Sequence, residues 1–217
     1  MRMHSASIGV ILLTIIVASC IVIALTPSIE AQEKDEWGVL PIADTYTDFS
    51  SGTPHGSEDT LEIENWTNIL DQQHKKLVWL KFSLGFLPSL PKGNVITDAT
   101  LKLYLLFSYE DTFSISAHSS LNHSWVESSL VYSNMPSYNA TPLDSVQVKW
   151  GGSKWYSWRV LDAVLQAVNN GSNLFTVVLQ PDDIMKMGLP IQFISRDTTT
   201  MIWFKPLLTI YYTVDIT

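Results

Sequence analysis

Two pairs of side chains in this sequence have the chemistry to bind a sugar, because each pair joins a flat indole ring to a cation. Trp79 lies two residues before Lys81, and Trp155 lies four residues before Arg159. An indole ring can cover the apolar C–H face of a sugar, while a nearby polar group takes its hydroxyls. Residues two or four apart on a strand share one face, so each pair would present both groups together. The alternative for each tryptophan is core packing.

A calcium site is the metal site that the sequence favours. The four candidate ligands are Asp44, Asp48, Glu58 and Asp197. Calcium takes six to eight oxygens, and Asp197 would join the others if its strand pairs with the first one. The alternative is that Asp44 caps a turn and the other carboxylates are solvated. Arg196 also has two interpretations, since it could anchor hydroxyls or a carboxylate of a ligand, or hold Asp197 in a structural pair.

Signals for catalysis are weak in this chain. The scattered histidines His55, His74, His118 and His123 show no metal-ligand spacing with one another. No G-x-S-x-G nucleophile elbow is present, and the adjacent acidic pairs lie in segments that we predict to be loops. We therefore predict a protein that is not an enzyme and that needs no cofactor, with calcium as the one ion that it could bind.

Four sequons predict N-glycosylation if the chain is made in a host that glycosylates. Their asparagines are Asn65, Asn122, Asn139 and Asn170. All four lie in segments that we predict to be loops or strand ends.

The elements that must position these groups are strands. Residues 76–107 contain two alternating segments joined by a loop rich in Pro and Gly. The first segment has Val78 and Leu80 on one face and Trp79 and Lys81 on the other, and the second segment has the same period. Some nine or ten such strands occur between residues 39 and 214, and a single helical pattern begins at Leu161. The sequence predicts an all-β fold, an antiparallel β-sandwich of jelly-roll type with one short helix, preceded by an N-terminal hydrophobic helix.

Several motifs in this order are similar to a known family. They are ADTY at 43–46, WLKFSL at 79–84, ITDATLKLY at 96–104, WVE at 125–127, NMP at 134–136, FISRD at 193–197 and KPLLTIYY at 205–212. Together they resemble the DNRLRE domain family, which overlaps the family 96 carbohydrate-binding modules and the disaggregatase-related modules of archaeal surface proteins. The resemblance implies a β-sandwich on an exported protein, with polysaccharide binding as the expected role.

The N-terminus carries an uncharged apolar run at residues 8–25 (IGVILLTIIVASCIVIAL), with Arg2 before it. We expect residues 1–31 to be a signal peptide or an N-terminal membrane anchor, residues 32–38 a linker, and residues 39–217 the sandwich domain. Either interpretation places the body outside the cytoplasm, secreted or at the cell surface. Cys20 is the only cysteine, so this body can form no disulfide.

The formal net charge of −8 argues against nucleic-acid binding by bulk charge. The interpretation that we favour is a non-catalytic module that binds a polysaccharide or glycan and touches the membrane only through its N-terminal segment. One alternative is a structural or adhesive cell-surface subunit that contacts protein neighbours through sheet edges and aromatic faces. A weaker alternative is a polysaccharide-modifying enzyme.

Overall fold

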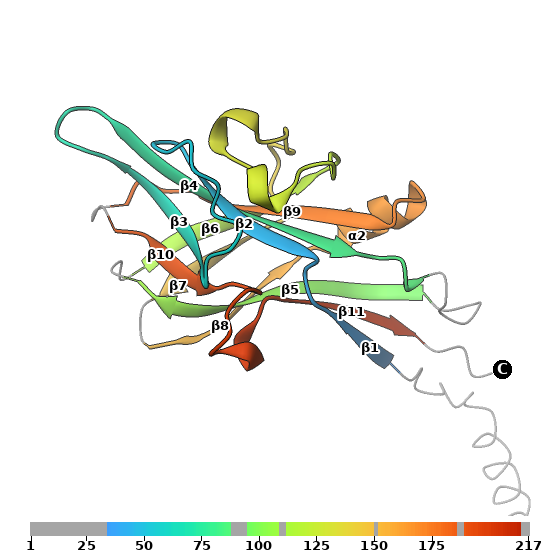
Figure 1. Ribbon diagram of the computed structural model, residues 1–217. Helices are drawn as coiled ribbons and strands as arrows, with labels where there is room; N and C mark the ends of the chain where they lie inside the picture. The colour runs from blue at the N-terminus through green and yellow to red at the C-terminus, as the bar shows by residue number, and fades with distance from the viewer. Residues whose placement is uncertain (1–33, 88–94, 109–111, 150–151, 186–188, 214–217) are drawn as a thin grey trace, which may run out of the picture. The chain divides into compact units, whose positions relative to one another are not determined.

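The computed structural model describes residues 34–87, 95–108, 112–149, 152–185 and 189–213, and strands dominate these ranges (Figure 1). The strands are β1 (Lys34–Val39), β2 (Ala43–Asp48), β3 (Thr60–Thr67), β4 (Gln73–Ser83), β5 (Val95–Phe107), β6 (Thr112–Ser120), β7 (Asp144–Lys149), β8 (Lys154–Arg159), β9 (Leu174–Pro181), β10 (Ile191–Ile194) and β11 (Leu207–Thr213). The described part also holds α2 (Leu161–Asn169) and the 3-10 turns η2 (Glu127–Ser129), η3 (Tyr132–Asn134) and η4 (Ile202–Phe204). The predicted N-terminal helix lies outside these ranges, within which no helix is long and apolar enough to cross a membrane.

One curled sheet contains all of these strands, and β3 joins its two halves. The order is β1-β11-β5-β10-β3-β4-β9-β6-β7, with β8 also paired to β5 and β2 also paired to β4. Residues 60–63 of β3 pair with β10, whereas residues 64–67 pair with β4. We call the strands β1, β11, β5, β8 and β10 the β5 half, and β2, β4, β9, β6 and β7 the β4 half. The pairings between described strands are antiparallel, so the prediction of a mostly β, antiparallel body with one short helix is confirmed.

The two halves fill one hydrophobic core from opposite sides. The central side chains on β4 and β5 are Val78, Leu80, Phe82, Leu101, Leu103 and Leu105, each fully buried. These are the faces that strand periodicity predicts to point inward, and burying one such side chain stabilises the fold by about 1.5–3 kcal/mol. The same core receives Trp158 from β8 and Val164 from α2.

The predicted linker at residues 32–38 is wrong at its C-terminal end, because β1 begins at Lys34. Its residues pair along β11, from Lys34 opposite Thr213 to Val39 opposite Leu208. Strand formation here depends on backbone pairing with a distant strand, which the charged sequence KDEWGV does not reveal. Trp37 anchors the strand by stacking on Phe86, with ring centroids 5.2 Å apart.

A segment without strands covers the outer face of the β4 half. We call residues 121–143 the capping segment, which Figure 1 shows in yellow above β2, β4 and β9. It forms a second buried cluster with these strands, whose members are Ala43, Leu77, Trp79, Trp125, Leu130 and Val178. Trp125 belongs to this cluster and Tyr132 packs against it, so both hold the irregular segment to the body.

Candidate functional site

Trp79 is a core residue, which contradicts its predicted role as a sugar-binding ring. Its side chain is 0% exposed, and its indole Nε1 donates a hydrogen bond to Thr47 Oγ1 at 3.2 Å. The rings of Trp125 and Tyr138 meet it edge-on, with centroids 6.3 Å and 5.9 Å away. Strand periodicity placed Trp79 correctly on the outer face of β4, but it could not show that the capping segment covers that face.

Lys81 holds the capping segment in place beside Trp79. Its Nζ donates to the backbone oxygen of Trp125 at 2.5 Å and lies 4.3 Å from the centroid of the Trp125 ring. Burial lowers the pKa of the Lys81 ammonium. The cation is therefore committed to an intramolecular contact, and the predicted Trp79–Lys81 ligand pair is not available at the surface.

Trp155, by contrast, lies on an open face of the β5 half. It is 40% exposed, and its register partner on β5 is Tyr104. The Tyr104 and Trp155 ring centroids are 5.3 Å apart, and the Phe204 ring from η4 lies 4.1 Å from Tyr104 and 6.3 Å from Trp155. We call Tyr104, Trp155 and Phe204 the aromatic platform. Trp203, which directly precedes Phe204 in the sequence, is 84% exposed.

Polar side chains continue this face along β5 and β8. Ser157 lies opposite Lys102, and Arg159 lies opposite Thr100. The Arg159 Nε donates to Asp98 Oδ1 at 2.9 Å, and this hydrogen bond raises the pKa of the guanidinium. Because a strand rises about 3.3 Å per residue, Trp155 and Arg159 are about 13 Å apart, so the face can contact more than one sugar ring.

The sequence contained a signal for part of the platform. Tyr104 shares the outer face of its strand with Lys102 by simple alternation. Phe204 could not be found in this way, because it lies in a three-residue 3-10 turn with no strand period.

Arg196 lies in a different place, at the centre of a network that joins three segments. Its Nη1 donates to the Ile42 backbone oxygen at 2.6 Å, and its Nη2 donates to Glu127 Oε2 at 2.9 Å. Its backbone N–H donates to Asp44 Oδ2 at 2.8 Å. The carboxylate of Asp197 is also close, with its Oδ2 3.6 Å from the Arg196 Nε. These partners support the structural interpretation of Arg196 as a tie between β2, η2 and the turn after β10.

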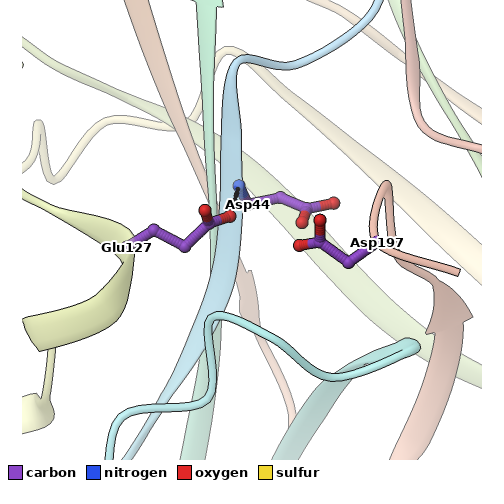
Figure 2. Close-up of side chains that lie close together, drawn as sticks. All are labelled: Asp44, Glu127 and Asp197. Carbon is purple, nitrogen blue, oxygen red and sulfur yellow. Dashed lines mark hydrogen bonds between the residues drawn. The ribbon is translucent and has the colours of Figure 1, made fainter.

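Three carboxylates meet around this guanidinium. One oxygen from each of Asp44, Glu127 and Asp197 lies within 4.8 Å of the others. Figure 2 shows Glu127 reaching the backbone N–H of Asp44, which donates to it at 2.7 Å, while the carboxylates of Asp44 and Asp197 face each other. Asp44 is 1% exposed. Its burial raises the pKa to about 7, although hydrogen bonds from Arg196 and Ser195 lower it.

The four predicted calcium ligands are not brought together. Asp44 and Asp197 are neighbours, and Glu127 joins them without having been predicted. Asp48 instead lies 3.9 Å from Lys76 Nζ. Glu58 accepts from the Tyr46 hydroxyl at 2.9 Å and pairs with His55 Nδ1 at 2.6 Å. Because Arg196 already supplies positive charge to the three-carboxylate cluster, the donor set fits a calcium ion poorly.

The sequon asparagines have two environments. Asn122, Asn139 and Asn170 are exposed and lie outside the strands, as predicted. Asn65 differs because it lies within β3, where its Nδ2 donates to the Asp183 backbone oxygen at 3.0 Å.

Comparison with known proteins gives one match that covers most of the chain. The model of carbohydrate-binding module family 96 matches residues 36–212. A search of curated proteins found no match to this chain.

Proposed function

This chain belongs to carbohydrate-binding module family 96, and from that premise we propose that it is a non-catalytic polysaccharide-binding module whose binding face is the aromatic platform with its flanking polar groups. The observation that carries the proposal is the contact between the rings of Trp155, Tyr104 and Phe204 on the outer face of β5 and β8, where Trp155 is 40% exposed and the other two rings are half-buried. Rings on a sheet are positioned by the backbone ladder, so little ordering entropy is lost when a ligand binds them.

Groups suited to sugar hydroxyls lie beside these rings. Lys102 and Ser157 face each other next to the platform, and Arg159 with Asp98 follows. Apolar rings beside donors and acceptors form the combination that covers the C–H face of a sugar and satisfies its hydroxyl groups.

The proposal is tested with the full chain on a polysaccharide array and by affinity electrophoresis. Retardation by at least one polysaccharide, lost on Trp155→Ala, is the expected result. Uniform mobility in every polysaccharide gel would contradict it.

A non-catalytic role is supported by the surroundings of Asp44, which among the described carboxyl groups most resembles a catalytic acid. Asp44 has a pKa near 7 and lies beside Glu127, which is a combination that enzymes use. Its side chain is nevertheless buried, and its two oxygens accept hydrogen bonds from Ser195 Oγ and the Arg196 N–H. A sugar could not reach it without opening the network.

An adhesive surface subunit is the alternative that a specific observation favours. The turn between β3 and β4 presents Ile69 and Leu70, which are 101% and 72% exposed. Two exposed aliphatic side chains on one turn can pack against an apolar surface of another protein. Sedimentation of the wild type and of an Ile69→Ser/Leu70→Ser variant over a wide concentration range tests this, because a strict monomer in both would contradict it.

We further infer an exported protein, secreted or held at the surface, that carries N-glycans where its host glycosylates and whose body is a sandwich of jelly-roll type. Export and anchoring rest on the apolar residues 8–25, and glycosylation rests on the exposed sequons. The sandwich is supported by the single core that the β4 and β5 halves share. Calcium binding stays a prediction, which titration calorimetry with calcium on the full chain would test.

A further inference from the structure

A polar groove lies between α2 and the capping segment. Two cavities of about 470 Å³ and 200 Å³ adjoin there, since both are lined by Ser119, Leu121 and Gln166. The larger one extends to residues 137–139, and the smaller one runs under the helix beside Ala163 and Ala167. We call this feature the helix–loop groove. Its size falls in the range of small-molecule sites, about 300–1,000 Å³.

The lining of the helix–loop groove is polar but uncharged. Its amide side chains are Asn122, Asn139, Gln166 and Asn170, and its hydroxyls include Ser119 and Ser137. None of the described residues that line it is Asp, Glu, Lys or Arg. His123 lines the smaller cavity, and burial and the charge of Lys81 lower its pKa, which favours the neutral ring. Amides and hydroxyls both donate and accept hydrogen bonds, as sugar hydroxyls do. The ring of Tyr138 and the exposed side chain of Leu121 add apolar surface for C–H groups.

The wall of the groove is fixed before any ligand arrives. The Asn139 N–H donates to the Ser119 backbone oxygen at 2.8 Å, and Ser120 Oγ donates to the Ser137 backbone oxygen at 2.8 Å. The Tyr138 hydroxyl donates to Gln180 Oε1 at 2.8 Å. A wall held by such bonds loses little entropy on binding.

The opposite wall is formed by α2, through the exposed Gln166 and the buried Ala163 and Ala167. The helix ends where Asn170 N–H donates to the Gln166 backbone oxygen and Gly171 adopts a φ of 67°. Ala163 and Ala167 are the small residues that leave space beneath Gln166. A larger side chain at either alanine would fill the smaller cavity.

We propose that the helix–loop groove is a second glycan site, distinct from the aromatic platform, and that it takes a short uncharged oligosaccharide. The inference rests on the proposed function, because it assumes that the module binds carbohydrate. An acidic sugar would find no lysine or arginine among the described lining residues, whereas a neutral sugar can pair its hydroxyls with the amides and the serines. The limited volume of the two cavities favours a few sugar units, while the platform, which continues along β5 and β8, favours a longer chain.

The test uses the full chain from a host that does not glycosylate, so that no glycan of its own can enter the groove. A panel of neutral and acidic oligosaccharides of two to four units is screened on an array, and the hits are titrated by calorimetry. Gln166→Ala should weaken binding of the neutral hits at least tenfold, and Gln166→Trp should abolish it. Asn169→Ala is the matched control, because it removes an exposed amide of the same helix that does not line the groove.

The outcomes separate this inference from the proposed function. Equal affinities for the wild type, Gln166→Ala and Gln166→Trp would overturn the groove site, as would a panel that yields only acidic hits. Loss of oligosaccharide binding on Trp155→Ala alone would overturn it as well, yet leave polysaccharide binding at the platform standing. A chain that binds neither polysaccharides nor oligosaccharides would overturn both.

Discussion

The indole rings of Trp79 and Trp125 meet edge to face with centroids 6.3 Å apart, and this contact closes the capping segment over β4. Trp79→Ala should therefore lower the free energy of unfolding by about 3–5 kcal/mol, because a fully buried indole leaves a cavity. Urea denaturation measures this. Trp155→Ala serves as the comparison, with an expected loss of about 1 kcal/mol or less for a ring near the surface. Similar losses in both variants would contradict the assignment of Trp79 to the core.

Trp155 should contribute to polysaccharide binding, whereas Trp79 contributes to stability. Trp155→Ala is expected to weaken polysaccharide binding at least tenfold, which corresponds to about 1.4 kcal/mol, because the platform loses its indole face. Trp37→Ala is the control, since this tryptophan is similarly exposed, at 44%, but packs against Phe86 beside β1. Affinity electrophoresis of the two variants checks the difference. Equal retardation would remove the platform from the binding face.

Asp44 should make stability fall as the pH rises from about 4 to about 7. Its pKa is about 7 in the folded protein against 3.8 as the ordinary value. Between these values the folded state holds a proton that the unfolded chain has lost, so this contribution is complete at low pH and lost by about pH 7. Asp44→Asn removes the titration. The Tm of the wild type should thus decline more steeply over this window than that of the variant, and calorimetry that gives parallel curves would refute the raised pKa.

Lys76 neutralises a group of carboxylates at the junction of β3 and β4. Its Nζ lies 2.8 Å from Glu62 Oε2 and 3.1 Å from Glu64 Oε2. Burial lowers the pKa of Lys76, but Glu62 and Glu64 raise it by more. Lys76→Met should cost about 3–5 kcal/mol, because it leaves largely buried carboxylates without a cation. Chemical denaturation measures this loss of unfolding free energy, and Lys75→Met is the control. A loss of the same size in Lys75→Met would show that the carboxylates around Lys76 are not the cause.

Glycans on the rim asparagines should block the helix–loop groove. Protein from a glycosylating host is expected to bind short neutral oligosaccharides more weakly than protein from a bacterial host, because Asn122 and Asn139 line the larger cavity. Thr141→Ala removes the Asn139 sequon and should restore part of the affinity. Thr67→Ala removes the Asn65 sequon on β3 and should restore none. Calorimetry measures the affinity of the wild type from each host and of the two variants from the glycosylating host. Identical affinities in all four samples would contradict a blocked groove.

The strands could be predicted where their own sequence alternates. β4 and β5 bury Val78, Leu80, Leu101 and Leu103 as their period requires, and α2 starts at the predicted Leu161. β1 could not be predicted, because its pairing with β11 depends on a strand at the other end of the chain. The covering of Trp79 was missed for the same reason, since the capping segment has no period from which its position follows.

The candidate site could be predicted only where its residues share a strand. Trp155 and Arg159 lie on one face of β8, as their spacing of four indicates. Phe204 and Glu127 belong to short turns, and only the folded chain brings Phe204 to Tyr104 and Glu127 to Asp44. Contacts between segments about a hundred residues apart leave no local pattern in the sequence.

The position of β3 in both halves of the sheet has a consequence for unfolding. Its first residues pair with β10 and its last residues pair with β4, so neither half can open at this strand without exposing the core of the other. Separate subdomains that melt one after the other are therefore not expected between β1 and β11. The most protected amides in hydrogen exchange should belong to both halves and exchange with one common free energy, which makes the module a single cooperative unit.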